Sequence, residues 1–440
     1  MWAACVERCS ARTAPQKRAS LTHLASIAGP ASFLIPAALA RGADDPIFAL
    51  NAEAARRAKA GESIVNATLG ALMTDDGKLA VLPSVFEAFA RVAPGRAAAY
   101  APIAGEPQFL AAVVRDVFKS SPLASQAIAV ATPGGTGALH HAIVNFLEPG
   151  DALLTPDFFW GPYQTLAEHT RRRVETFAMF DAARRFDTKS LERALDQQIA
   201  KQKRALILLN TPCNNPTGYS LDDAEWREVV RVVRHHAKRA PVTLVLDLAY
   251  AKFADESAEH WVGHAEKLAG EALVLVAWTA SKSFAQYGAR VGALVAVHPD
   301  EAERKRIAAA LAFSCRGTWS NCNHLGMLAI TLLLTDPDLV RRSNDEREQL
   351  RALVDERVAA FNRAAREKGL DFPRHEGGFF VSVFTREPER AAARMRELGV
   401  FVVPIPGALR VALCSTPARD VPRLVEALHD AVQTPSPVHP

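Results

Sequence analysis

A lysine among hydroxyl and guanidinium groups is the feature of this sequence that most directly indicates chemistry. Lys282 stands in the run Thr-Ala-Ser-Lys-Ser-Phe, and Thr279, Ser281 and Arg290 lie close to it along the chain. Hydroxyl groups and a planar guanidinium are good partners for phosphate oxygens. A lysine amine beside them can hold a cofactor covalently. Most lysines are solvated surface charges, so this interpretation needs support from other segments.

Three apolar segments end at polar residues, and they provide that support. Residues 271–278 lead to Lys282, residues 241–246 run into Asp247, and residues 205–209 open into a turn-rich loop that contains Asn215. Each segment has the length and composition of a buried strand, and open α/β sheets bind ligands at their strand ends. Asp247 either caps a turn or faces a protonated ring nitrogen. Asn215 and Tyr250 are each able to donate to a phenolate oxygen.

A glycine-rich run adds a second candidate phosphate contact. Residues 132–139 read Thr-Pro-Gly-Gly-Thr-Gly-Ala-Leu and join a short apolar strand to a helix with one apolar face. Glycines let the backbone approach an anion, and the free N–H groups at the start of a helix favour phosphate. The same run is also compatible with a plain flexible turn.

Together these segments resemble the fold-type I pyridoxal-phosphate enzymes, specifically the class I aminotransferases of the aspartate and aromatic amino acid group. The shared order is Asn-Pro-Thr-Gly, Asp-x-x-Tyr, Ser-x-Lys and Arg-x-Gly, and the resemblance extends from about residue 45 to about residue 430. It implies that Lys282 binds pyridoxal 5'-phosphate covalently, that Asp247 pairs with the pyridine nitrogen, and that Trp160 stacks on the ring. It further implies that Tyr250 and Asn215 contact the ring hydroxyl. The implied phosphate contacts are Gly134, Gly135, Thr136, Thr279, Ser281 and Arg290.

The resemblance also implies how substrate is bound. Arg410 resembles the arginine that binds the substrate α-carboxylate, and Gly70 the glycine of the loop beside it. Arg316, followed by Trp-Ser-Asn, resembles the arginine that crosses a dimer interface to bind a distal carboxylate. Tyr100 resembles the tyrosine that reaches the phosphate of the neighbouring subunit. A homodimer with shared active sites follows, with Tyr100 and Arg316 supplied by the neighbour.

Three positions depart from the family pattern. Gly134 replaces a usual serine, and Tyr163 and Asn210 replace frequent histidines. These departures affect one phosphate contact and the surroundings of Asp247.

The activity implied by the resemblance is transfer of an amino group between an amino acid, aspartate or aromatic, and a 2-oxo acid such as 2-oxoglutarate. The reaction would be ping-pong, with Lys282 moving the proton and Asp247 and Tyr250 assisting. Two other classes stay open. One is a β-lyase or decarboxylase with the same cofactor, against which Arg316 argues. The other is a cofactor-binding amino-acid sensor without catalysis, which would be coupled to a helix-turn-helix module that the sequence does not suggest.

The expected fold class is α/β, a fold-type I transferase in which a mostly parallel sheet of the seven-stranded type lies beside a smaller α/β domain. At 440 residues and 49% hydrophobic content, two domains are expected. Residues 80–348 would form the large, cofactor-binding domain, and residues 45–79 with 349–440 the small one. Residues 346–366 read as a long charged helix linking them. Residues 1–44 are expected to be an extension and an arm over the partner subunit, although residues 31–40 also resemble part of a secretory signal.

Composition and cysteine spacing bear on the ligands and the location of the protein. The net charge of +4 comes from scattered rather than clustered basic residues, which argues against nucleic-acid binding. The six cysteines form no C-x-x-C pair, which argues against a metal site and favours a reducing compartment such as the cytoplasm. No run of 18 apolar residues occurs, so we expect no membrane-spanning helix.

Overall fold

The computed structural model describes residues 32–39, 41, 46–255 and 259–433. The chain divides into two compact units, Met1–Asp45 and Pro46–Pro440. In the first unit, α1 (Pro36–Leu39) is a single short helix. Most of the predicted extension and arm over residues 1–44 lies outside the described residues. Among the helices that are described, none combines the length and apolar character that crossing a membrane requires.

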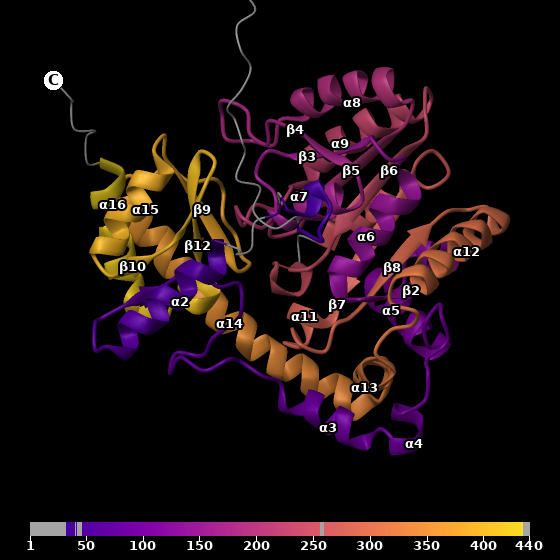
Figure 1. Ribbon diagram of the computed structural model, residues 1–440, viewed down its shortest axis with the longest axis horizontal. Coiled ribbons are helices and arrows are strands. Elements are labelled where there is room, and N and C mark those ends of the chain that lie inside the picture. Colours follow the sequence, from indigo (N-terminus) through magenta and orange to yellow (C-terminus); the bar gives the residue numbers. More distant parts are fainter. Residues whose placement is uncertain (1–31, 40, 42–45, 256–258, 434–440) are drawn as a thin grey trace, which may run out of the picture. The chain divides into compact units, whose positions relative to one another are not determined.

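The main sheet of the second unit has seven strands in the order β2-β8-β7-β6-β5-β3-β4 (Figure 1). Its strands are β2 (Ala127–Pro133), β8 (Val291–Val297), β7 (Leu273–Thr279), β6 (Val242–Asp247), β5 (Ala205–Asn210), β3 (Ala152–Pro156) and β4 (Arg173–Phe177). Only β8 among them runs antiparallel to its neighbours, and the five strands from β7 to β4 are parallel. The predicted α/β class and mostly parallel sheet are therefore confirmed.

The main sheet is covered by helices on both faces. Successive residues of a strand point to opposite faces, so Val274 and Val276 belong to one core cluster while Leu275 and Ala277 belong to another. The first face packs against α5 (Pro107–Phe118), α8 (Thr188–Gln202), α9 (Asp223–Ala237) and, beyond α5, α13 (His324–Thr335). The second packs against α6 (Gly134–Phe146), α7 (Pro162–His169) and α12 (Glu301–Thr318). Because both faces are covered, the central strands β5, β6 and β7 are nearly all apolar, which explains why they were recognisable in the sequence, whereas the edge strand β4 is more polar and partly exposed.

Two smaller sheets lie in the C-terminal part of the chain. β11 (Val403–Ile405), β12 (Ala408–Ala412) and β9 (Phe380–Phe384) form an antiparallel sheet, and β1 (Val65–Asn66) pairs in parallel with β10 (Val400–Phe401). Residues 400–405 are thus divided between two sheets. α2 (Pro46–Lys59), α15 (Pro388–Glu397) and α16 (Val421–Gln433) pack nearby.

The long helix α14 (Pro337–Glu367) connects these regions (Figure 1). Leu339, in its first turn, belongs to the core of the main sheet, whereas Val354 and Phe361 belong to the core of the smaller sheets. The helix begins earlier than the predicted residue 346 because Asp336 caps it, accepting from the N–H groups of Asp338 and Leu339. It also packs on α3 (Pro83–Arg91). The predicted boundaries of two domains stay a prediction, since Pro46–Pro440 forms one unit.

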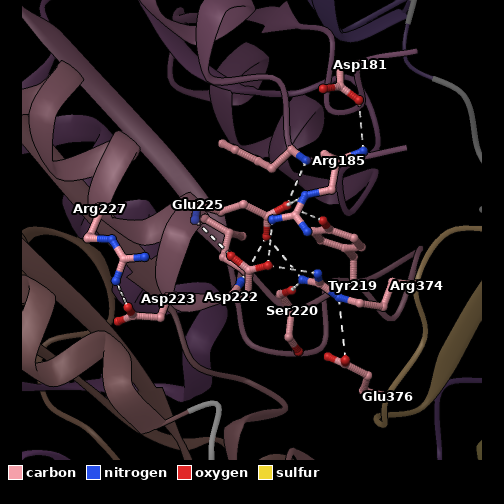
Figure 2. A network of polar contacts seen from close by, with 12 residues as sticks. Asp181, Arg185, Tyr219, Ser220, Asp222, Asp223, Glu225, Arg227, Arg374 and Glu376 are labelled. Carbon is pink, nitrogen blue, oxygen red and sulfur yellow. Dashed lines mark hydrogen bonds and ion pairs between the residues drawn. The ribbon is translucent and has the colours of Figure 1, made fainter. Parts of the chain in front are cut away.

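A network of charged side chains joins Arg374, in the C-terminal segment, to the start of α9 (Figure 2). Arg374 donates to Glu225 at 3.1 Å and to Asp222 at 3.1 Å, and Arg185 donates to Asp222 at 2.6 Å. Glu225 is 5% exposed and also accepts from the hydroxyl of Tyr219 at 2.5 Å. These donors compensate for the removal of the Glu225 carboxylate from water.

Candidate active site

A pocket of about 170 Å³ lies where β5, β6 and β7 end. Asn210, Asp247 and Thr279, the last residues of these three strands, all line it. The predicted residues among its walls are Gly135, Thr136, Trp160, Asn215, Asp247, Tyr250, Thr279, Ser281, Lys282 and Arg290. Leu139 and Ala249 line it as well and were not predicted. The pocket lies at the strand ends, where parallel sheets bind ligands.

Lys282 lies in the single turn α11 (Ala280–Ser283), directly after β7. The hydroxyl of Thr279 caps this turn by accepting from the N–H of Ser281 at 3.2 Å. Lys282 Nζ lies 5.4 Å from the centroid of the Tyr250 ring and 5.9 Å from that of Tyr287. Burial lowers the pKa of Lys282, because the ammonium loses hydration; Asp247 opposes this shift and Arg290 adds to it. The neutral amine, which acts as a nucleophile or base, is thereby favoured.

Asp247 is held by neutral donors. Its Oδ2 accepts from the hydroxyl of Tyr163 at 2.7 Å, and its Oδ1 accepts from the N–H of Ala249 at 3.1 Å. Burial raises the pKa of Asp247, whereas these two bonds and the charge of Lys282 act to lower it. Burial also raises the pKa of Tyr163, so this phenol stays a neutral donor. A buried carboxylate with neutral donors is well suited to face a cationic group of a ligand, as predicted for the ring nitrogen.

Asn210 connects the residues around Asp247 with those around Tyr250. Its Nδ2 donates to the backbone oxygen of Asp247 at 2.9 Å, and its Oδ1 accepts from the N–H of Asn215 at 2.6 Å. Asn215 Nδ2 in turn donates to the hydroxyl of Tyr250 at 3.2 Å. In the sequence Asn210 was noticed only as a replacement of histidine. Its position at a strand end was the available signal for a role in the pocket.

The predicted phosphate contacts form a cluster of donors. The hydroxyls of Thr279 and Ser281 lie 3.0 Å apart, and Arg290 Nη1 lies 3.5 Å from the Ser281 hydroxyl. Gly134, at the start of α6, has φ +71°, and a Cβ atom there would lie 2.8 Å from Arg290 Nη2. Glycine in place of serine thus leaves room for the guanidinium, although Gly134 itself does not line the pocket. Hydroxyls, a guanidinium and the N–H groups of a helix start suit a phosphate.

Gly70 and Arg410 lie outside the pocket walls but close to them, and Phe380 connects both to Tyr250. The guanidinium carbon of Arg410 lies 4.7 Å from the centroid of the Phe380 ring, which is 5.7 Å from the Tyr250 ring. A Cβ atom on Gly70 would lie 2.7 Å from Phe380 Cζ. Arg410 Nη2 donates to the backbone oxygen of Thr68 at 2.5 Å, which fixes the arginine beside the Gly70 segment. No sequence signal distinguished Phe380 from other core residues.

Tyr100 and Arg316 are not brought to this pocket. Tyr100 is 91% exposed. Arg316, in the last turn of α12, is exposed and donates to the Ser320 hydroxyl at 2.6 Å. The roles that the resemblance implies for both residues, in the site of a neighbouring subunit, stay a prediction.

Tyr287 is a further residue beside Lys282 that the sequence did not single out. Its hydroxyl accepts from the N–H of Leu72 at 3.0 Å, which ties the Gly70 segment to the lysine. Burial raises its pKa, so the hydroxyl stays protonated.

The residues present fit pyridoxal phosphate. The pocket offers donors for a phosphate, a carboxylate for a ring nitrogen, an indole face and an amine of lowered pKa. Within the described part of the chain, no group of three or more His, Cys, Asp or Glu side chains is arranged to hold a metal ion.

Comparisons with known proteins agree with this geometry. The sequence model of the family described as aminotransferase class I and II matches residues 62–428. An aromatic-amino-acid aminotransferase from Paracoccus denitrificans is 28% identical to this chain. The aligned region covers 75% of this chain and 82% of the Paracoccus enzyme. The crystal structure of an aminotransferase from Anaerococcus prevotii has a TM-score of 0.86 and 32% identity, covering 92% of this chain and 100% of that one. An aromatic-amino-acid aminotransferase from Burkholderia pseudomallei, solved covalently bound to pyridoxal phosphate, has a TM-score of 0.77 and 26% identity over 90% of this chain and 99% of that one.

Proposed function

The chain belongs to the class I and II aminotransferase family, and from that premise we propose which substrates and which residues carry its reaction. It is a pyridoxal-phosphate-dependent aminotransferase. Its donor is an aromatic amino acid or aspartate, and its acceptor is a 2-oxo acid such as 2-oxoglutarate. The names of the similar enzymes from P. denitrificans and B. pseudomallei support an aromatic donor. The described residues and the comparisons contain nothing that favours a lyase, a decarboxylase or a non-catalytic sensor.

The observation that carries the residue assignment is the convergence of Lys282, Asp247 and Tyr250 on one pocket. Bound pyridoxal phosphate supplies an electron-withdrawing ring that stabilises negative charge at the substrate Cα. Lys282 Nζ removes the Cα proton, for which its lowered pKa suits it. Asp247 keeps the ring nitrogen positively charged. Asn215 and Tyr250 hold the ring oxygen, and Trp160 orients the ring plane.

The phosphate lies, in this proposal, among Gly135, Thr136, Thr279, Ser281 and Arg290, with Gly134 making room for the guanidinium. Arg410 binds the α-carboxylate beside Gly70. The enzyme is a homodimer in which Tyr100 and Arg316 complete the site of the neighbouring subunit. The exposure of both side chains in one subunit, together with their predicted roles, supports this arrangement.

Arg316 distinguishes dicarboxylate from monocarboxylate substrates, which gives the first experiment. Arg316→Leu should reduce kcat/KM for glutamate or aspartate by about 30-fold or more, since a stranded buried charge costs about 2–5 kcal/mol. Phenylalanine has no second charge, so its half-reaction should change much less. Single half-reactions with glutamate and phenylalanine measure the two effects separately. Equal losses for both would remove Arg316 from the specificity pocket.

A subunit-mixing experiment tests the shared site. Lys282→Ala and Arg316→Leu subunits are unfolded, mixed and refolded together, and glutamate turnover is measured. If Arg316 acts across the interface, each hybrid dimer holds one intact site, and about a quarter of wild-type turnover should return. If Arg316 acts within its own subunit, no hybrid site is intact and turnover stays at the level of the separate variants.

We also propose a cytoplasmic location and the predicted division into two domains. The four cysteines that the structure describes, Cys213, Cys315, Cys322 and Cys414, are free thiols, which suits a reducing compartment. The separate core cluster around the smaller sheets contains Val65 and Leu72 as well as Val354 and Phe361, which supports a small domain made of residues 45–79 and 349–440. Cell fractionation tests the location, and identification of the stable fragments after limited proteolysis tests the division into domains.

A further inference from the structure

Asp116 is a largely buried carboxylate that lies close to the elements carrying the catalytic residues without lining their pocket. It belongs to α5, and its side chain is 16% exposed. Its Oδ1 accepts from Lys252 Nζ at 2.8 Å, and its Oδ2 accepts from Trp278 Nε1 at 2.8 Å. Each oxygen therefore binds a donor from a different segment.

Those two segments carry the proposed catalytic groups. Lys252 lies in the short helix η2 (Ala251–Phe253), which directly follows Tyr250. Trp278 is the second-last residue of β7, just before the turn that holds Lys282, and its indole is 3% exposed. A single carboxylate thus connects the segment of Tyr250 to the segment of Lys282.

A third contact reaches the same turn from α14. Arg347 Nη1 donates to the backbone oxygen of Ser283 at 3.3 Å, and its guanidinium carbon lies 5.6 Å from the Phe284 ring centroid. Burial acts to raise the pKa of Asp116, but Lys252 above all, with Trp278 and Arg347, lowers it overall. Asp116 is therefore ionised, and the charges of Lys252 and Arg347 stabilise its carboxylate.

The contacts of Asp116 border space that protein atoms do not fill. Two cavities, of about 520 and 450 Å³, both include Asp116 and Lys252 in their walls. Solvent reaches these hollows, so on that side the bordering side chains are held by hydrogen bonds and ion pairs rather than by protein packing.

We propose that Asp116 is a positioning residue for transamination: by binding Lys252 and Trp278 together, it fixes Tyr250 relative to Lys282. This inference rests on the proposed roles of Lys282 and Tyr250. Asp116 does not touch the substrate, and its effect passes through the two residues that it binds.

Asp116→Asn tests the proposal, because asparagine keeps the shape but has one acceptor oxygen and no charge. In the holoenzyme, kcat should fall about tenfold or more while KM changes less, since small misplacements of catalytic groups are costly. The pH midpoint of the visible absorbance of the bound cofactor should shift as well.

Trp278→Phe removes the hydrogen bond from the indole to Asp116 without changing any charge. It should lower kcat in the same way. That variant separates positioning from a through-space charge effect, and it decides the matter alone if Asp116→Asn does not fold.

Glu225→Gln is the matched control (Figure 2). It also removes the charge of a buried, hydrogen-bonded carboxylate, but the partners of Glu225 include Tyr219, Arg374 and Arg185, none of which lines the pocket. The melting temperature of Glu225→Gln should fall. Its kcat should stay within about twofold of wild type, and its absorbance midpoint within about 0.2 pH units, as expected for a substitution away from the site.

A merely structural role would make Asp116→Asn and Trp278→Phe behave like this control, with lower melting temperatures and unchanged kcat and midpoint, and the proposal would be overturned. Failure of the proposed function is recognised separately. In that case Lys282→Ala would keep its activity, whatever the Asp116 variants do.

Discussion

At the scale of the residue, burial shifts the pKa values of the two central groups in opposite directions. The pKa of Asp247 is raised and that of Lys282 is lowered, so both shifts disfavour the charged form of the group. The charged groups of the bound cofactor would offset part of the free-energy cost of keeping Asp247 and Lys282 charged. The pocket is therefore built for a ligand that is itself charged.

Lys282→Ala tests the covalent role of the lysine. The variant should lose nearly all transamination, and borohydride treatment should no longer attach the cofactor to the chain, because no other predicted site residue carries a primary amine. Intact-protein mass spectrometry after reduction checks the attachment. A cofactor still fixed to the variant after reduction would contradict the assignment.

Tyr163 and Asp247 make a graded pair of substitutions. Asp247→Ala should lower the rate of Cα proton removal about 100-fold or more.

Tyr163→Phe removes only one hydrogen-bond donor to Asp247. That bond holds the pKa of the Asp247 carboxyl down, so this pKa should rise further in the variant. The carboxylate then protonates at a higher pH, and the acid limb of the pH–kcat profile should move to higher pH. An unchanged profile in Tyr163→Phe would show that the phenol does not influence Asp247.

At the scale of the element, the loop between β5 and α9 depends on contact with the C-terminal segment. Gly218 has φ +72°, and a Cβ atom there would lie 2.2 Å from the backbone oxygen of Phe380. The hydroxyl of Ser382, in β9, donates to the backbone oxygen of Pro216 at 2.9 Å. The loop that carries Asn215 is therefore held in place by a strand from another sheet.

Gly218→Ala should destabilise the protein and weaken cofactor retention. The added methyl group meets backbone, which cannot move away cheaply, and the positive φ adds strain of about 1 kcal/mol or more. Gly61→Ala is the matched control, because Gly61 also has a positive φ, of +92°, but nothing lies within 4 Å of a Cβ there. The denaturation midpoint should fall more in Gly218→Ala than in Gly61→Ala. Equal midpoints would mean that the close approach to Phe380 carries no cost.

At the scale of the whole molecule, buried histidines make stability depend on pH. Burial lowers the pKa values of His140 and His375 from 6.5 to about 4. Between those values the unfolded chain binds more protons than the folded one, so stability falls as the pH falls. Above pH 6.5 these groups no longer contribute to the slope.

His375→Gln isolates one of these contributions. His375 is 3% exposed, and its shift corresponds to about 3 kcal/mol between pH 6.5 and 4. The variant should lose less stability than wild type over that interval, as measured by the denaturant midpoint at each pH. His235, which is exposed, provides the control His235→Gln, whose pH dependence should match wild type. Identical slopes in all three proteins would contradict the assignment to His375.

Much of the site was predictable because its signals are local. Lys282, Asp247 and Asn215 each follow an apolar segment that reads as a buried strand, and β7, β6 and β5 end where those segments end. Residue order along a parallel sheet brings such strand ends together, so the pocket follows from the strand pattern. The likeness to a known family added the roles of Trp160, Arg410 and Arg316, which spacing alone does not reveal.

Only the tertiary structure revealed the contacts between residues far apart in the chain. The bond from Tyr163 to Asp247 spans 84 residues, and the bond from Trp278 to Asp116 spans 162. Neither pair has a shared pattern, because a polar residue on a helix reads the same whether it meets solvent or a buried donor. The sequence determined where the chemistry-bearing residues stand on their strands, through local hydrophobic periodicity. The structure decided which distant side chains hold them, because those contacts depend on how helices pack on the sheet.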